Sequence, residues 1–495
     1  MKSLYLHKFI LLSFLGFGQS EVNSYLSDWN KAGLLNPEFK SAHVIRLSPN
    51  ADTSVPVNES FESAFRALEG KPGVILLAEG KYLITKTLQV PSNTLIKGMG
   101  PGKTVVYINN GGNGHGFSVE GGMESTRYAI DAPKKGDRTI TLQEPLPEYV
   151  RWIRWIREDQ DLCHANWCYS MTGQFFLIER RKGNVIYLHD AIRDSTRPTA
   201  KHVVAVMQPA ENVFFEDFSI IRLDRTSSQS SNFHFNYAVN CRVSGVASYF
   251  TNYAHVEARN SAHIEVSGCY FTLSHGYGGG GRGYGTMIHL GSVNCLVWDN
   301  TFDVLRHSMI TQAGANGNVF AFNYSLNPRQ TTTLFGIDIE NSLTGDMVLH
   351  GNYTYANLFE GNRAVMAIAD NAHGFSGPNN VFFKNHIGRN GFSVIEPNTH
   401  RIALINNRID GPVLFLMGQN HLEINTVTPS SIRRPVDFGI KNVTTALKRM
   451  SRSFQKEYLG ATTLHGILLP AEVRYKSTSK TTSEYSFKIP RLRLR

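Results

Sequence analysis

The sequence has few charged residues and, after its first 20 residues, no long apolar run. Asp, Glu, Lys and Arg make up only 18% of the 495 residues. No later segment reaches the ~18 consecutive apolar residues that are typical of a transmembrane helix. Zinc-finger spacing, RNP-like motifs and helix-turn-helix patterns are missing as well. The sequence therefore predicts no transmembrane segment in the mature protein and no nucleic-acid partner.

Cysteines are also few, and an odd number of five cannot all pair internally. Cys163 and Cys168 flank a short loop and could form a small disulfide in an oxidising compartment. Cys241 and Cys295 occupy the same place in two repeats that a whole coil separates, ~10 Å along the axis. A disulfide needs α-carbons within about 7 Å. We interpret these two, with Cys269, as small buried packing residues.

Residues 1–20 predict a secretory signal peptide. Lys2 and Lys8 precede the apolar stretch FILLSFLGFG, and small and polar residues follow it. A buried first helix is the alternative interpretation. An exported protein would be secreted or held at the cell surface, in an extracellular or periplasmic setting, and we expect it to be a monomer.

The net charge of +10 and the isoelectric point of about 9.2 favour a polyanionic partner, because a positive protein attracts polyanions over long distances. For an exported protein, an acidic polysaccharide is the expected polyanion. The alternative is that the surplus charge only keeps the protein soluble.

Short strand-like segments recur through the middle of the chain. Apolar residues alternate with a period of two in segments rich in Val, Ile, Phe, Tyr and Thr, which favours strands over helices. The residues that open one strand of each repeat are Val213, Val243, Ile264, Val297, Val319, Val348, Val381 and Ile402. A basic spacing of about 21 residues with insertions in some repeats is typical of a solenoid.

Asparagines recur a few residues after these positions, at Asn300, Asn323, Asn352, Asn385 and Asn406. Asparagines stacked on one another can form a ladder of side-chain amides. Together with the strand pattern, they predict an all-β fold, a right-handed parallel β-helix with three sheets and coils about 4.8 Å apart.

The repeats divide the chain into four parts. Residues 1–20 are the signal peptide, 21–75 an N-terminal cap segment, 76–425 the β-helix and 426–495 a C-terminal strap or tail. In the cap segment a short helix would place Phe61, Ala64, Phe65 and Leu68 on one face and cover the first coil. Residues 125–208 interrupt the repeats and predict a small β-rich insertion. Its Trp152 and Trp155 could stack on sugars or, more commonly, fill a core.

The opening of the β-helix carries a family resemblance. GKYLI, followed by VPSNTLIKGMGPGKTVV, resembles the first coil of the pectate lyase superfamily of secreted parallel β-helices. The resemblance covers residues 75–425 and implies that a polysaccharide lies along the sheet before the small-residue turn. The vWiDH-type signature and Asp-rich calcium cluster of pectate lyases are missing, as is the NTD, DD, HG and RIK series of polygalacturonases. The resemblance therefore implies a fold and does not transfer an activity.

Ionisable side chains gather on the strands of that sheet. If the aliphatic residues point inward, the outward side chains are those of His234, His255, Glu257, Arg259, His289, Arg306, His307, Asp338, Glu340 and Asp370. We expect His234, His255, Glu257 and Arg259 to bind substrate. Glu257 and His289 fall on adjacent coils, where they could form a carboxylate–imidazole pair or a plain structural ion pair. The glycine-rich segment 275–285 predicts a mobile flap whose Arg282 and Tyr284 would also touch substrate, or else a disordered bulge.

These residues allow three functions. The preferred interpretation is a lyase that cleaves a uronate-containing polysaccharide by β-elimination, with Arg306, His307 and His289 as base and carboxylate neutraliser. Asp338 and Glu340, two residues apart on one strand, would suit calcium. With Asp370 they would also suit two-carboxylate glycoside hydrolysis. The non-enzymatic alternative is an adhesin that only binds carbohydrate.

Overall fold

The computed structural model describes residues 27–195, 198–370, 372–394, 401–415 and 422–427. The predicted signal peptide at 1–20 and nearly all of the predicted C-terminal strap at 426–495 lie outside the described residues. In the part of the chain that is described, no helix is long and apolar enough to cross a membrane.

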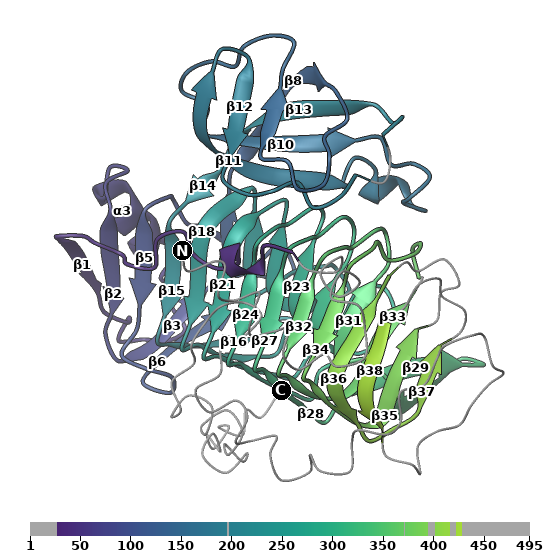
Figure 1. Cartoon of the computed structure of the whole chain (residues 1–495). Coiled ribbons are helices and arrows are strands. Elements are labelled where there is room, and N and C mark those ends of the chain that lie inside the picture. The colour runs from purple at the N-terminus through teal and green to yellow at the C-terminus, as the bar shows by residue number, and fades with distance from the viewer. Residues whose placement is uncertain (1–26, 196–197, 371, 395–400, 416–421, 428–495) are drawn as a thin grey trace.

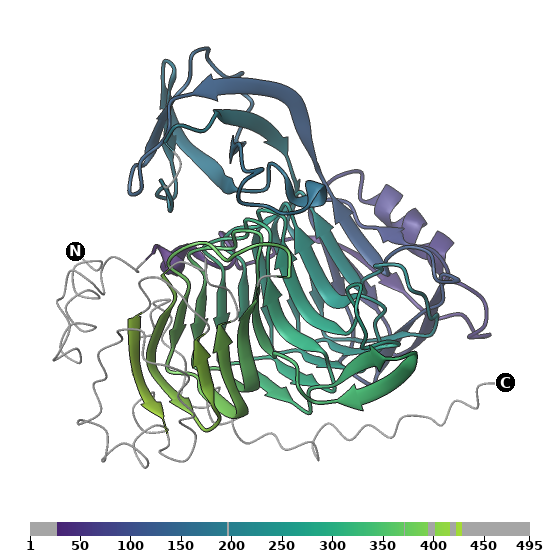
Figure 2. The ribbon, with the colours of Figure 1, turned by 90° about the vertical axis from the view of Figure 1, so that its right-hand side faces the viewer.

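The main body is a parallel β-helix, as the sequence predicts (Figures 1 and 2). The chain passes through three parallel sheets in turn and then repeats the circuit one coil further along the axis. Figure 1 shows this progression as a colour gradient from purple at one end of the solenoid to yellow-green at the other.

Sheet 1 contains the strands that open each circuit. They are β1 (His43–Leu47), β2 (Gly73–Leu77), β5 (Thr94–Lys97), β15 (Val213–Glu216), β18 (Ala238–Ser244), β21 (Ala262–Ser267), β24 (Leu296–Trp298), β27 (Val319–Ala321), β32 (Leu358–Glu360), β34 (Val381–Phe383), β36 (Ala403–Ile409) and β38 (Leu422–Val427). The two-residue strand β14 (Ala210–Glu211) pairs with the start of β18.

Sheet 2 follows sheet 1 in each coil. It contains β3 (Gly80–Ile84), β6 (Thr104–Ile108), β16 (Ser219–Arg222), β19 (Ala247–Tyr249), β22 (Tyr270–Thr272), β25 (Thr301–Asp303), β28 (Tyr324–Leu326) and the first parts of β33 (Arg363–Asp370) and β35 (His386–Val394).

Sheet 3 closes each coil before the small-residue turn. It contains β4 (Leu88–Gln89), β7 (Phe117–Glu120), β17 (Phe233–Asn236), β20 (Ala254–Arg259), β23 (Tyr284–His289), β26 (His307–Thr311), β31 (Met347–His350), the second parts of β33 and β35, and β37 (Val413–Phe415).

The inside of the coil is an apolar core. Alternate strand residues point inward, and side chains of successive coils stack on one another. The rings of Phe320, Phe359 and Phe382 stack with centroids 4.7 Å apart at each step. The regular spacing of coils therefore repeats the same buried contact along the axis, which stabilises neighbouring coils against each other.

The predicted asparagine ladder is confirmed, with two corrections. Its members are Asn300, Asn323, Asn362, Asn385 and Asn407, and the side-chain amide of each of the first four donates to the side-chain oxygen of the next at 2.9–3.0 Å. The prediction of Asn352 and Asn406 was wrong. Val348 belongs to sheet 3, and Leu358 is the sheet 1 residue opposite Val319, so counting from Val348 shifted the register of that coil.

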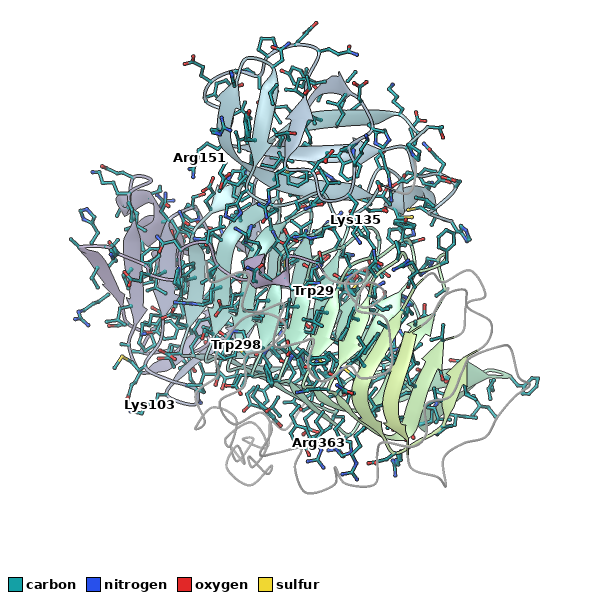
Figure 3. The ribbon with its side chains drawn as sticks, viewed as in Figure 1. Trp29, Lys103, Lys135, Arg151, Trp298 and Arg363 are labelled. Carbon is teal, nitrogen blue, oxygen red and sulfur yellow. The ribbon has the colours of Figure 1, made fainter. Side chains whose placement is uncertain are left out.

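The N-terminal cap segment covers the outer face of sheet 1. The short 3-10 helix η1 (Trp29–Lys31) places Trp29 against Leu296 and Val319, and the Trp29 indole donates to Ala356 O. Figure 3 shows Trp29 and Trp298 over the same face. Helix α3 (Asn58–Ala67) buries Phe61 and Ala64 and contacts β1 and β4 at the N-terminal end. The cap segment therefore packs on the outer face of sheet 1 and buries residues there.

The insertion forms a six-stranded sheet of its own, standing above the helix in Figure 1. Its elements are β8 (Gly122–Ile130), β9 (Thr139–Thr141), β10 (Trp152–Arg157), η2 (Asn166–Cys168), β11 (Gly173–Lys182), β12 (Val185–Leu188) and β13 (His202–Gln208). Antiparallel pairing of β8 with β13 places Gly122 opposite Gln208. Trp152 and Trp155 are only 2% and 1% exposed, so they fill a core and do not offer a sugar-stacking surface.

The insertion rests on the turns that follow sheet 3. Arg154 donates to Asn260 Oδ1 at 3.2 Å, and Gly173 O accepts from Asn316 Nδ2 at 2.9 Å and from Tyr355 Oη at 2.6 Å. These three partners lie on different coils, so the insertion spans several turns.

The five cysteines are all buried and unpaired. The predicted disulfide between Cys163 and Cys168 is wrong, since the Cys163 thiol instead donates to Cys168 O at 3.2 Å. Cys241, Cys269 and Cys295 lie in the core, as predicted.

Candidate functional site

The outer face of sheet 3 carries two parallel rows of side chains. The polar row consists of Asn236, Arg259, His289, Gln312, His350 and Asp370, which neighbouring coils bring opposite one another. The apolar row consists of Met287, Ile310 and Val348 and continues from His234 and Glu257. At ~4.8 Å per coil, the six members of the polar row extend over about 24 Å, a length that suits a polymer.

Glu257 and His289 form the predicted carboxylate–imidazole pair. His289 Nε2 lies 3.0 Å from Glu257 Oε1, and the Ser231 hydroxyl donates to Glu257 Oε2 at 2.8 Å. Burial alone raises the pKa of Glu257, but the hydrogen bond from His289 and the nearby histidines outweigh burial and lower that pKa to about 2. Because the carboxylate is ionised and only accepts, His289 donates from Nε2 and keeps its Nδ1 lone pair when neutral.

Three neighbouring members of the polar row each have a buried polar atom without a hydrogen-bond partner among the described residues. These atoms are Arg259 Nε, His289 Nδ1 and Gln312 Oε1. A buried polar atom without a partner is destabilising by about 1–3 kcal/mol, so native proteins seldom leave three side by side. Such a group indicates a place where a polar ligand completes the hydrogen bonds.

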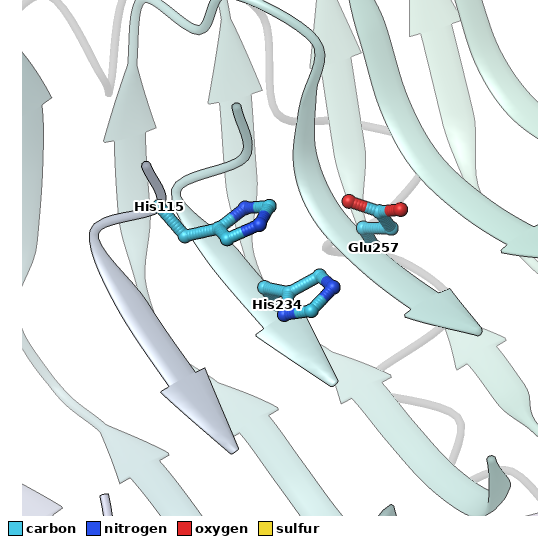
Figure 4. A group of neighbouring side chains, drawn as sticks. All are labelled: His115, His234 and Glu257. Atoms are coloured by element: carbon cyan, nitrogen blue, oxygen red, sulfur yellow. The ribbon is translucent and has the colours of Figure 1, made fainter. Parts of the chain in front are cut away.

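His115 and His234 stand next to Glu257, as Figure 4 shows. Their rings stack with centroids 3.8 Å apart. His115 Nδ1 accepts from Ser231 N at 3.1 Å, so the proton of the neutral ring lies on Nε2. The Ser118 hydroxyl donates to Glu120 and therefore accepts from His234 Nδ1 at 2.9 Å, which leaves a lone pair on His234 Nε2. One ring thus offers a donor and the other an acceptor.

His115, His234 and Glu257 also have the residue types of a metal site, with candidate ligand atoms within 4.8 Å of one another. A histidine that binds a metal through Nε2 carries its proton on Nδ1 and donates it to an acceptor. His115 faces a backbone N–H donor at Nδ1 instead, so its Nε2 is protonated and cannot act as a ligand. Burial also lowers the pKa of His115 to about 4 and keeps that ring neutral. The trio fits hydrogen bonding to a ligand better than it fits a metal.

The site is also bordered by Tyr253 and by the glycine-rich loop, residues 275–283. The Tyr253 ring lies 5.3 Å from that of Tyr284 and 6.5 Å from that of His289. Gly281 has a φ of +76°, and a Cβ there would come within 2.8 Å of the Tyr253 ring. The loop therefore approaches Tyr253 closely enough to require glycine. Arg282, predicted to touch substrate, lies half-buried in this loop.

Arg306 holds this loop. Its guanidinium donates to Gly278 O at 2.9 Å and lies 5.9 Å from the Tyr284 ring. His307 stacks on Tyr284 and hydrogen-bonds through Nδ1 to Gly345 O at 2.8 Å. Burial, followed by the charge of Arg306, lowers the pKa of His307 to about 3. Arg306 thus contacts the backbone of the glycine-rich loop, and burial favours the neutral form of the His307 ring. The catalytic roles of Arg306 and His307 stay predictions.

A second carboxylate–imidazole pair lies further along the polar row. His350 Nδ1 lies 2.7 Å from Asp370 Oδ2. Burial raises the pKa of Asp370, but the hydrogen bond from His350 outweighs burial, and the pKa is lowered. The His350 ring is 6.1 Å from that of His307 and 5.3 Å from that of His373.

The predicted placement of His255 on the outer face of sheet 3 is wrong. His255 points into the coil, where its ring nitrogens lie 2.8 Å from Ser248 Oγ and 3.1 Å from Leu273 O. The chain turns into sheet 3 with two consecutive inward residues, His255 and Val256, so strict alternation fails there. Burial lowers the pKa of His255 to about 3.

Asp338 and Glu340 lie outside sheet 3. They belong to an antiparallel hairpin of β29 (Gln330–Leu334) and β30 (Ile337–Asn341), which is inserted before the true sheet 3 strand β31. Asp338 accepts from Thr333 Oγ1 at 2.6 Å, and Glu340 pairs with Arg329. Both carboxylates are exposed and occupied by these partners, so the predicted joint site with Asp370 on sheet 3 is wrong. Calcium binding by the two stays a prediction.

Sequence reasoning missed His115 and Gln312. His115 precedes the strand FSVE, whose pattern matches FHFN of the next coil, and this match was the available signal. Gln312 directly follows the strand HSMIT, which ends at Thr311.

Replacing Arg306 by Ala is expected to loosen the glycine-rich loop. The substitution removes the hydrogen bond to Gly278 O, so backbone amides of residues 275–283 should exchange with solvent faster, by about fivefold or more for a lost bond of ~1 kcal/mol. Hydrogen exchange with mass spectrometry measures this. Arg363→Ala is the matched control, because Arg363 lies over the Tyr324 ring at 5.2 Å on sheet 2 (Figure 3). Unchanged exchange in the Arg306 variant would refute the positioning role.

Comparisons with known proteins give a fold and no family. No family model matches the sequence, and no curated protein matches it. Among solved structures, the chain is similar to the tailspike protein gp49 of Pseudomonas phage LKA1, with a TM-score of 0.54 and 14% identity over 71% of this chain and 57% of that chain. It is also similar to the gp54 tailspike of Acinetobacter baumannii bacteriophage AP22, with a TM-score of 0.52 and 11% identity over 84% of this chain and 68% of that chain.

The chain thus spans little more than half the length of the LKA1 tailspike. Identities this low show a shared parallel β-helix and leave membership of the pectate lyase superfamily a prediction.

Proposed function

We propose that this protein cleaves an acidic, uronate-containing polysaccharide by β-elimination on the outer face of sheet 3. The observation that carries the proposal is the Glu257–His289 pair, whose His289 Nδ1 is buried without a partner among the described residues and stands in the polar row. A neutral imidazole oriented by a carboxylate is an effective general base near neutral pH. The AP22 tailspike, a structural neighbour, was solved in complex with a capsular saccharide.

In the proposed reaction, His289 Nδ1 takes the proton beside the uronate carboxyl group. The electron pair of that C–H bond forms a carbon–carbon double bond, and the bond to the glycosidic oxygen breaks. Arg259, the neighbour of His289 in the row, balances the uronate charge and makes the proton more acidic. Tyr253 returns a proton to the leaving oxygen. Burial, followed by Glu257, raises the pKa of Tyr253 well above its usual value, so this phenol stays protonated until it donates.

Hydrolysis with two carboxylates fits less well. A glycosidase needs one carboxylic acid with a raised pKa beside a second carboxylate. The pKa values of Glu257 and Asp370 on this face are both lowered. Asp346 does have a raised pKa, about 6, because it is buried, but it accepts from Ser325 Oγ and two backbone amides inside the coil.

The test is an incubation with a panel of uronate-containing polysaccharides and one neutral glucan. Elimination produces an unsaturated sugar that absorbs in the ultraviolet, so absorbance should grow with a uronate polymer and stay flat with the neutral glucan. Parallel runs with and without a calcium chelator report whether a metal takes part. New reducing ends without absorbance would identify a hydrolase. Binding without either product would identify an adhesin.

A further inference from the structure

Trp167 is the one tryptophan among the described residues whose side chain is exposed. Its side chain belongs to η2 of the insertion and is 43% exposed, whereas Trp29, Trp152 and Trp155 are at most 2% exposed. A tryptophan offers a large flat apolar surface, and leaving one in water loses the stabilisation of burial. An exposed tryptophan on a well-held element therefore indicates a surface that binds something.

The segment around Trp167 is firmly held. The buried carboxylate of Asp159 accepts from Ser170 N at 2.7 Å and from Thr172 N at 2.9 Å. Inside the loop, Cys168 N donates to Ala165 O at 3.0 Å. These bonds fix the backbone on both sides of Trp167, so its ring is preorganised for a partner and little conformational entropy is lost on binding.

The ring of Trp167 is linked to the polar row on sheet 3 through His373. It lies 5.4 Å from the ring of His373, which in turn lies 5.3 Å from His350. The loop is attached to the same turn, because His164 N donates to His373 O and Asn352 Oδ1, both at 3.4 Å. His373 therefore lies between Trp167 and the His350–Asp370 end of the polar row.

His350 supplies the matching polar group. Its Nδ1 faces the ionised Asp370 carboxylate at 2.7 Å and so carries the proton. In the neutral ring, Nε2 then presents a lone pair, which can accept from a sugar hydroxyl. His350 is two coils beyond His289 in the polar row, ~10 Å along the axis, so a sugar bound here is separate from the one being cleaved.

We propose that Trp167 and His350 form a distal sugar-binding subsite, in which a pyranose ring stacks on the Trp167 indole and a hydroxyl donates to His350 Nε2. This subsite rests on the proposed polysaccharide function and extends it, since the insertion then contributes to binding the polysaccharide beside sheet 3. The ligand is the same polysaccharide chain that reaches His289, held two coils further along the axis.

The test compares Trp167→Ala with wild type in binding the uronate polymer that wild type binds most tightly in the panel. We expect Trp167→Ala to bind that polymer about tenfold more weakly, with a raised KM and an unchanged kcat. Oligosaccharides too short to reach from His289 to Trp167 should bind both proteins equally. Trp167→Phe, which keeps an aromatic face, should recover most of the affinity.

Tyr149→Ala is the matched control, because Tyr149 is 66% exposed on the same insertion and its hydroxyl bonds to Glu124. This variant should bind as wild type does. Equal polymer affinity in Trp167→Ala and wild type would overturn the subsite while leaving the cleavage chemistry standing. Weaker binding by Trp167→Ala without any cleavage by wild type would support the subsite and refute the lyase. A wild type that binds no polymer in the panel would overturn both proposals.

Discussion

Replacing His289 by Ala is expected to lower kcat for the cleaved polymer about 1,000-fold, within the range that a general base contributes. The substitution removes the one imidazole that Glu257 orients and whose other nitrogen is free to take a proton. Polymer binding should change much less, because the rest of the polar row remains. Initial rates of ultraviolet absorbance, together with a separate binding measurement, distinguish the two effects.

Two further variants sharpen this result. Glu257→Gln keeps an oxygen opposite His289 Nε2 but removes the negative charge, so it should also slow the reaction. His386→Ala is the matched control, because His386 forms a similar pair with Asp410, at 2.6 Å, on sheet 2. It should keep full activity. If the His289 variant retained wild-type kcat while the protein stayed folded, the base would have to be another residue.

Replacing Asn323 by Ala is expected to reduce the free energy of unfolding by about 3 kcal/mol or more. Asn323 accepts from the backbone and side chain of Asn300 and donates to Val297 O and Asn362 Oδ1, all at 2.9–3.1 Å. Alanine removes these four hydrogen bonds. The buried groups of the two adjacent coils that bonded to Asn323 then lose their partner. Urea unfolding followed by circular dichroism measures the loss.

Asn113→Ala is the control for the ladder. Asn113 is exposed, and its side-chain amide donates one hydrogen bond, to Gly111 O at 3.5 Å. Its substitution should therefore change the free energy of unfolding by no more than about 0.5 kcal/mol. Equal losses in the two variants would mean that the ladder contributes no more than any surface asparagine.

The fold could be predicted because a solenoid repeats its pattern. The period-two strands and recurrent asparagines specify a parallel β-helix, and Asn300, Asn323 and Asn385 occupy their expected positions in the ladder. The error at Val348 came from the hairpin of β29 and β30, because its segment IDIEN has the same alternation of apolar and polar residues as a strand of sheet 3. Alternation identifies a strand but does not say which sheet the strand joins.

The site could be predicted only where the strands are regular. Glu257 and His289 were paired correctly because the middle of sheet 3 keeps strict alternation. His255 was misplaced because the corner of the coil holds two inward residues in succession. Trp167 could not be foreseen, because its position beside His373 depends on how the insertion docks on turns of distant coils.

The pairing of β8 with β13 has a consequence for the order of folding. Thr94 and Val213 are neighbours in sheet 1 although the whole insertion separates them along the chain. Closing so long a loop is entropically unfavourable, and the free-energy cost rises with loop length. Once Gly122 and Gln208 are paired, the two ends of the insertion already meet, and only a short connection remains to be closed. We therefore expect the insertion to fold early. By holding its two ends together, it would allow the coils after it to form on the coils before it.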